Sequence, residues 1–143
     1  MVKAHRGTVP HPLQLMVREP RRLGFSSRDG VWLRFVDVVA ALRARTYAPE
    51  ASIAIELDDP LFEANAGRWE VSSDADGVGT VRRARRGADV ALDVGALTSI
   101  DLGAGRFAEL ATAGRATELR PGALRRADAL FATNRAPFCD SGF

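Results

Sequence analysis

The sequence is poor in the residue types that build disulfides and metal sites. Its 143 residues include one cysteine, Cys139, and two histidines, His5 and His11. A single cysteine excludes an internal disulfide and is consistent with a reducing cytoplasm, where we expect this protein to reside. Zinc sites need close pairs of Cys or His, and catalysis by Cys139 needs a neighbouring base. We therefore predict no metal site and an inert thiol.

Long apolar segments are also absent. No run reaches the roughly 18 apolar residues of a membrane-spanning helix, so no membrane span is predicted. Residues 1–16 have no apolar stretch typical of a signal peptide. The composition, 46% hydrophobic and 27% charged, is that of a globular protein.

Lysine is nearly missing from the basic residues. Lys3 is the only one, so 19 of the 20 basic side chains are arginines. Few groups then titrate near neutrality, which explains a pI of about 9.3 at a net charge of only +2. The densest basic cluster, residues 82–86, has no interleaved aromatic residues on which bases would stack. We interpret it as a solvated hairpin end and predict no nucleic-acid partner.

The N-terminal part has the composition of a linker. Gly7, Pro10 and Pro12 interrupt residues 1–22, which we interpret as an arm preceding a domain of residues 23–143. Alternating apolar residues predict a first strand over 31–36. Asp37 is a suitable N-cap for a short amphipathic helix over 38–47.

The middle of the chain predicts a sheet and the last third predicts helices. Strands are expected at residues 53–57, from Trp69, at 79–83 and at 90–94, and helices at 96–102, from Phe107 and from Pro121. Grouped strands followed by helices indicate an α+β fold, a mostly antiparallel sheet with helices packed on one face.

Two groups of residues are candidates for a site. Trp32, Ile53, Leu92 and Phe107 would line any apolar pocket between sheet and helices. Such residues more often form a filled core, because protein interiors pack densely. The carboxylates at 56–59 are interpreted as a strand end entering a turn.

Several blocks of sequence carry a resemblance to a known family. They are DGVWLRFVDVVAALRARTY, NAGRW, ADVALDVGAL, RPGALRRADALF and NRAPFCDSGF, at residues 29–47, 65–69, 88–97, 120–131 and 134–143. In this order they resemble the C-terminal region of Eis-type (enhanced intracellular survival) N-acetyltransferases. The similarity runs from about residue 12 to residue 143.

The resemblance implies a third domain of a longer enzyme. In that family two acetyltransferase domains of the GNAT type precede a domain with a sterol-carrier-protein-like fold, which is α+β. GNAT domains hold the acetyl-CoA pyrophosphate at a helix N-terminus, after a motif of the type [RQ]-x-x-G-x-[GA]. No such motif occurs in residues 1–143. We therefore expect no cofactor in this chain, with acetyl-CoA bound only by the full-length enzyme.

One catalytic role is implied by the resemblance. Eis-type enzymes use the C-terminal carboxylate as general base, and here it belongs to Phe143, after a matching Gly142. Asp140 and Ser141 depart slightly from the family pattern. The family's general-acid tyrosine lies in the preceding domains, so Tyr47 is not its counterpart.

Three functions remain open at this level. The main hypothesis is an accessory domain that shapes the substrate cleft of the acetyltransferase, supplies the Phe143 carboxylate and is inactive alone. Its partners would be the acetyltransferase domains of the same polypeptide, and a homo-oligomer stays open. The alternative is a stand-alone sterol-carrier-like domain that binds an apolar ligand such as a lipid or sterol. A regulatory or nucleic-acid module that uses the arginine cluster is the weakest of the three.

Overall fold

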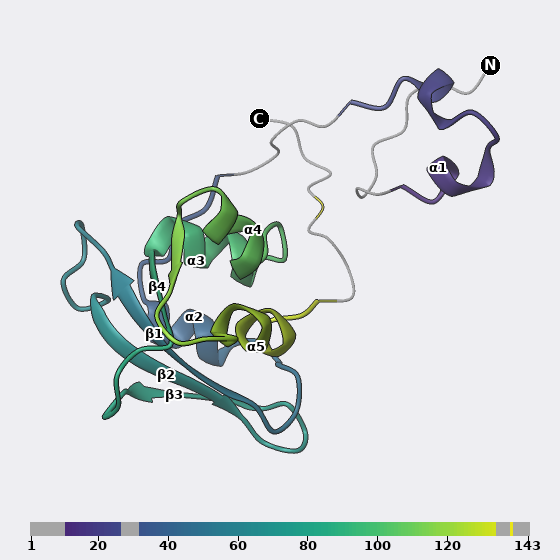
Figure 1. Ribbon diagram of the computed structural model, residues 1–143. Helices are drawn as coiled ribbons and strands as arrows, with labels where there is room; N and C mark the ends of the chain where they lie inside the picture. Colours follow the sequence, from purple (N-terminus) through teal and green to yellow (C-terminus); the bar gives the residue numbers. More distant parts are fainter. Residues whose placement is uncertain (1–10, 27–31, 134–137, 139–143) are drawn as a thin grey trace.

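The chain is built around one mixed sheet (Figure 1). The computed structural model describes residues 11–26, 32–133 and 138. In this part of the chain the sheet has five strands in the order β3-β2-β1-β4-β5. The strands are β1 (Ser52–Asp58), β2 (Gly67–Ser73), β3 (Gly79–Arg83), β4 (Val90–Asp93) and β5 (Ala116–Glu118). Only the β1–β4 pair is parallel, so the prediction of a mostly antiparallel sheet is confirmed.

Helices cover one side of this sheet. They are α2 (Val38–Arg43), α3 (Val94–Asp101), α4 (Phe107–Thr112) and α5 (Ala123–Leu130), and Figure 1 shows them on the same side. Two short elements, α1 (Leu13–Met16) and the 3-10 helix η1 (Pro20–Leu23), lie apart from the sheet. Among the described residues no helix is both long and apolar enough to cross a bilayer. The proposed boundary at residue 22 stays a prediction.

The core follows from the two-residue period of the strands. In β1 the side chains of Ile53, Ile55 and Leu57 are buried, whereas Glu56 and Asp58 are exposed on the other face. The buried set continues through β2, β3 and β4 and meets the helices at its fully buried members Leu42, Leu97, Ile100, Phe107 and Leu130. Burying one such side chain stabilises the fold by about 1.5–3 kcal/mol.

Local side chains set the turns and helix starts. The predicted N-cap is confirmed, because Asp37 Oδ1 accepts a hydrogen bond from the Ala40 N–H at 2.9 Å. Between β2 and β3, Asp74 Oδ1 accepts from the N–H groups of Asp76 and Val78. Gly77 closes that turn at φ 78°, and a Cβ there would lie 2.5 Å from the Tyr47 carbonyl oxygen. Only glycine fits this position.

The prediction of a strand over residues 31–36 is wrong for the described part, residues 32–36. This segment has no strand partner among the described residues, and Trp32 is 87% exposed. Side chains, not a backbone ladder, hold it to the sheet. The structure also contains β5, which the sequence analysis missed, and it ends α2 at Arg43 and begins α5 two residues after Pro121.

Asn65 joins the irregular segment to the sheet. Its Oδ1 accepts a hydrogen bond from the Val38 N–H at 3.1 Å, and its Nδ2 donates to the Val36 carbonyl at 3.1 Å and to Asp59 Oδ2 at 2.9 Å. Its backbone carbonyl accepts from Trp69 Nε1 in β2 at 2.7 Å. One buried amide therefore fixes the start of α2, the segment before it and the turn after β1.

Asp59 is the charged partner in this network. Burial alone would raise the pKa of its carboxyl group. Hydrogen bonds from Asn65 and from the Phe62 and Leu61 N–H groups, together with the charge of Arg34, outweigh burial and lower that pKa. Asp59 therefore stays ionised and holds Arg34, which lies in the segment before α2.

Replacing Asn65 should loosen this part of the fold. We expect Asn65→Ala to lower the free energy of unfolding by about 3 kcal/mol, because it leaves the Val38 N–H and the Val36 carbonyl without partners. Thr80→Ala, at an exposed position of β3, should change the free energy of unfolding by less than about 0.5 kcal/mol. Urea unfolding of the 143-residue chain measures both, and equal stabilities would contradict the anchoring role.

Candidate functional site

Arg45 joins the ends of two helices on the side of the fold where α5 ends. Its Nη1 donates to the backbone carbonyl and to Oδ1 of Asp101, both at 3.0 Å, and its Nη2 donates to the Phe131 carbonyl at 3.1 Å. The guanidinium lies 4.9 Å from the ring centroid of Tyr47 and 5.0 Å from that of Phe131. These contacts fix the last turn of α3 against the end of α5.

Burial raises the pKa of both acidic groups near Arg45. The pKa of Tyr47 lies well above its usual range because its phenol is buried; the negative charge of Asp101 adds to this and Arg45 opposes it. The pKa of Asp101 is raised by burial, which the Arg45 contacts only partly offset. The Tyr47 hydroxyl donates to the Leu42 carbonyl at 2.6 Å. It therefore has a structural role and is turned away from solvent.

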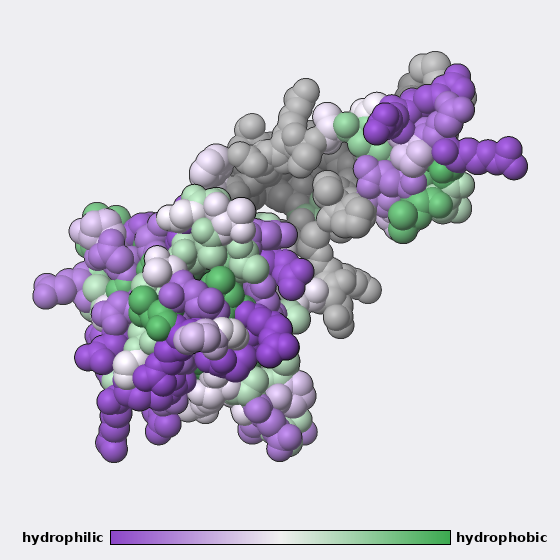
Figure 2. All heavy atoms as spheres, viewed as in Figure 1, coloured by the Kyte–Doolittle hydropathy of each residue, from purple (hydrophilic) through white to green (hydrophobic). Residues whose placement is uncertain are grey.

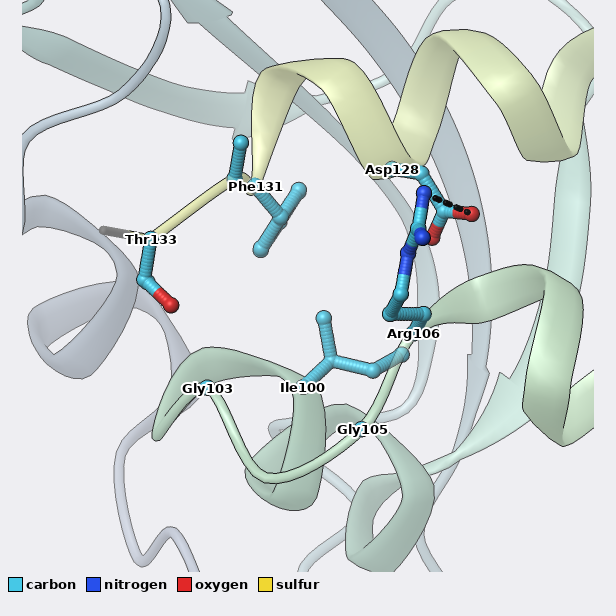
Figure 3. A pocket seen from close by; sticks show the side chains of 8 residues that line it. Ile100, Gly103, Gly105, Arg106, Asp128, Phe131 and Thr133 are labelled. Atoms are coloured by element: carbon cyan, nitrogen blue, oxygen red, sulfur yellow. Dashed lines mark ion pairs between the residues drawn. The ribbon is translucent and has the colours of Figure 1, made fainter. Parts of the chain in front are cut away.

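A cavity of about 280 Å³ opens beside this contact (Figure 3). Its walls come from the α3–α4 connection and the end of α5, namely Ile100, Gly103, Gly105, Arg106, Asp128, Phe131, Ala132 and Thr133. In Figure 3 the side chains of Ile100 and Phe131 point into it from opposite sides. One apolar and one charged wall make this a small mixed pocket, unlike the long apolar cavity that a lipid chain needs.

Asp128 and Arg106 form the charged wall. Asp128 Oδ1 accepts from the Phe107 N–H at 2.6 Å, at the start of α4, and Oδ2 lies 3.6 Å from Arg106 Nη2. Asp128 is nearly buried, whereas Arg106 is largely exposed. The carboxylate therefore orients α4, and the Arg106 guanidinium remains open to solvent at the rim.

The cavity lies just before the segment that the resemblance singled out. Thr133 is the last residue before 134–143, of which the structure describes only Phe138. Phe143, the expected catalytic residue, and Cys139 lie outside the described residues. Arg45 thus holds Phe131, two residues before Thr133, against the end of α3. Sequence reasoning missed the contact between Arg45 and Asp101 because these residues are 56 positions apart.

The four residues predicted to line an apolar pocket lie in different surroundings in the described structure. Ile53 and Phe107 are fully buried members of the packed core, and Leu92 is a nearly buried wall of a shallow depression between β1, β4 and β5. Trp32 is exposed, because its segment lies outside the sheet. An apolar pocket lined by these residues stays a prediction.

Metal ligands do not gather in the described part of the chain. No group of three or more His, Cys, Asp or Glu side chains there is arranged to hold an ion. His11 accepts a hydrogen bond at Nδ1 from the Leu13 N–H, and His5 is outside the described residues.

Comparison with known proteins assigns the fold to a family. The sterol carrier protein domain family matches residues 38–140, and the chain belongs to it. The chain is 42% identical to an uncharacterized N-acetyltransferase of Streptomyces coelicolor, over 91% of this chain and 31% of that protein. It is 36% identical to N-acetyltransferase Eis of Mycobacterium tuberculosis, over 75% of this chain and 26% of that protein.

Solved structures give the same relationship. The crystal structure of Eis1 from Mycobacterium abscessus is 41% identical with a TM-score of 0.79, over 94% of this chain and 34% of that one. A GCN5-related N-acetyltransferase from Kribbella flavida is 34% identical with a TM-score of 0.68, over 77% of this chain and 28% of that one. The resemblance to the sterol-carrier-like domain of Eis-type N-acetyltransferases is confirmed. The chain spans about a third of the length of these relatives.

A substitution at Phe107 distinguishes a filled core from a core with a cavity that holds a lipid. In a filled core, Phe107→Ala should lower the free energy of unfolding by about 4 kcal/mol through a new void, whereas Val78→Ala, at an exposed position, should cost less than about 0.5 kcal/mol. A loss below about 1 kcal/mol for Phe107→Ala, together with a lipid retained in native mass spectrometry, would instead indicate a ligand cavity.

Proposed function

We propose that this chain is the accessory domain of an Eis-type N-acetyltransferase, packed against acetyltransferase domains of the same polypeptide. The observation that carries the proposal is the set of large apolar side chains exposed on residues 13–25 and 32–36. Its large exposed side chains are Leu13, Leu15, Met16, Leu23, Phe25, Trp32, Leu33 and Val36. Figure 2 shows hydrophobic residues at the surface of the segment that carries α1.

Large apolar side chains are rarely this exposed together on a surface that contacts only solvent. Leu15 and Trp32 are each 87% exposed and Val36 is 70% exposed. Exposed apolar side chains that form a patch mark an interaction site, and Trp32, Leu33 and Val36 lie within one five-residue segment. The segment nearest the sheet is also held in place, by Arg34 on Asp59 and by Asn65 on the Val36 carbonyl. Its apolar side chains are thus presented on a fixed backbone.

The names of the relatives support acetyltransferase domains as the partner of these exposed side chains. Relatives that are 36–42% identical are N-acetyltransferases, and this chain accounts for about a third of each. In the proposed enzyme the preceding domains would bind acetyl-CoA and this domain would form a wall of the acceptor cleft. No acetyl-transfer activity is expected from the 143 residues alone.

A paired stability measurement tests this packing. We expect Leu33→Asp/Val36→Asp to change the free energy of unfolding of the isolated chain by less than about 0.5 kcal/mol, because both side chains are exposed there. In the full-length polypeptide the same variant should cost at least about 2 kcal/mol, since burial of each side chain is lost. Val78→Asp, another exposed position, is the control. Equal small effects in both proteins would refute the interdomain contact.

We also propose that the Phe143 carboxylate is the general base of the full-length enzyme. A free α-carboxyl group has a pKa of about 3.3–3.7, so a useful base needs an environment that raises it. The aromatic ring of the same residue would exclude water and have that effect. The resemblance of residues 134–143 to the Eis-type closing segment supports this role.

Extending the tail tests the role of the carboxylate. We expect addition of two glycines after Phe143 of the full-length enzyme to lower kcat by at least about a hundredfold, because the base is displaced. Replacing Phe138 with leucine keeps the terminus in place and should leave kcat within a few-fold. An extended enzyme that unfolds like the parent and keeps its full kcat would exclude the terminal carboxylate as base, while leaving the interdomain contact untouched.

A further inference from the structure

Seven of the chain's arginines lie on two neighbouring stretches at one end of the sheet. Arg82, Arg83, Arg85 and Arg86 lie at the end of β3 and in the connection to β4, and Arg120, Arg125 and Arg126 lie between β5 and the first turns of α5. The backbone joins the two stretches, because the Leu119 and Arg120 N–H groups both donate to the Asp89 carbonyl, at 2.8 and 3.2 Å. Their relative position is therefore fixed.

Asp89 is the buried centre of this cluster. Its side chain is 3% exposed, and Oδ2 accepts from the Ala54 N–H at 2.8 Å and pairs with Arg86 Nη2 at 2.7 Å. Arg120 Nε and Arg126 Nη2 lie 3.7 and 3.8 Å from Oδ1. These two distances exceed those of a hydrogen bond. Asp89 therefore attracts both guanidinium groups without forming hydrogen bonds to them, and Arg126 gives one donor, Nη1, to the Pro121 carbonyl at 3.3 Å.

The charges around Asp89 do not balance. Glu70 pairs with Arg82 at 2.8 Å and with Arg86 at 3.4 Å. Four guanidinium groups thus face two carboxylates, with an excess of two positive charges. The side chains of Arg120 and Arg126 are each about half exposed. An anion approaching from solvent would meet both of them, and Arg86, which pairs with the same Asp89 carboxylate, would add its positive charge.

We propose that Arg120, Arg126 and Arg86 form a binding site for a phosphate group. Guanidinium groups bind phosphate oxygens through two parallel N–H donors, and a tetrahedral anion can bridge several of them. Asp89 prevents the arginines from separating, and the rigid loops lower the cost of arranging them. The ligand is a phosphate-bearing small molecule or a phospholipid headgroup. This site shares no residue with the exposed apolar side chains of residues 13–25 and 32–36 and does not depend on the proposed acetyltransferase role.

A nucleic acid fits this surface less well. Single strands are bound by stacking on exposed aromatic rings, and the nearby Trp69 ring is occupied by Arg83, whose guanidinium carbon lies 3.8 Å from the ring centroid. Arg83 also donates to the carbonyls of Ala64 and Ala66. It therefore belongs to the fold, and the free donors form a compact spot instead of a stripe.

Titration calorimetry of the 143-residue chain with inorganic pyrophosphate tests the site. We expect Arg120→Gln/Arg126→Gln to weaken binding by about tenfold or more, because charge-assisted hydrogen bonds are lost. Arg115→Gln is the matched control, since Arg115 is also half exposed and lies 3.6 Å from a carboxylate, Asp93. It should change affinity less than about twofold, as its distant charge is screened.

A second double variant distinguishes a loss of binding from a loss of folding. Arg120→Lys/Arg126→Lys keeps both charges, so it should unfold at the parent temperature and still lose affinity by several-fold, because an ammonium group lacks the planar pair of donors. Parent-like affinity in both double variants, or no pyrophosphate binding by the parent chain, would overturn the proposal.

Vesicles distinguish the two sources of phosphate. Binding to vesicles with phosphatidic acid but not to pure phosphatidylcholine, lost in Arg120→Gln/Arg126→Gln, would identify a headgroup. Pyrophosphate binding without vesicle binding would identify a soluble ligand. Tight binding of a DNA duplex that survives the double variant would overturn the site, since phosphate would then bind elsewhere on the chain.

Discussion

The buried amide of Asn65 is the contact on which the arrangement of this domain depends. It holds the Val38 N–H at the start of α2, the Val36 carbonyl before it and the Asp59 carboxylate after β1. Asp59 in turn holds Arg34. A segment without a strand partner in the described structure is thereby attached to the sheet through side chains. Phe35 packs against the core. The hydrogen bonds of the segment explain how Leu33 and Val36 nevertheless remain exposed on a fixed backbone.

The proposed function rests on an anchored segment whose large apolar side chains are exposed in this chain. The sheet and its helices fill their own core, as the complete burial of Ile53 and Phe107 shows. Of the apolar side chains of residues 32–36, Phe35 packs against this core, whereas Trp32, Leu33 and Val36 remain exposed. The relatives that contain a region of this fold are about three times as long as this chain. A single side chain has a similar anchoring role near residue 131, where Arg45 joins the end of α3 to the end of α5.

Sequence patterns predicted the parts of the fold that depend on local periodicity. Ile53, Ile55 and Leu57 alternate, and Asp37 precedes a helix, so β1 and the start of α2 were predictable. The same period of two misassigned Trp32 and Leu33, because alternation indicates an extended chain but does not reveal whether another strand pairs with it. Asn65 and Asp89 act between residues far apart in sequence, and β5 has three residues with little apolar pattern. Such contacts arise only from the tertiary arrangement.

The central claim is the proposal that the exposed apolar side chains of residues 13–25 and 32–36 are covered by the rest of a longer acetyltransferase. Hydroxyl-radical footprinting with mass spectrometry measures this in one experiment on the isolated chain and on the full-length polypeptide. Trp32 and Met16 should be oxidised rapidly in the isolated chain and at least about tenfold more slowly in the full-length protein, as expected when exposed apolar side chains become buried at an interface. Buried Trp69 should stay protected in both and exposed Val78 reactive in both. Equal oxidation of Trp32 and Met16 in the two proteins would contradict the account.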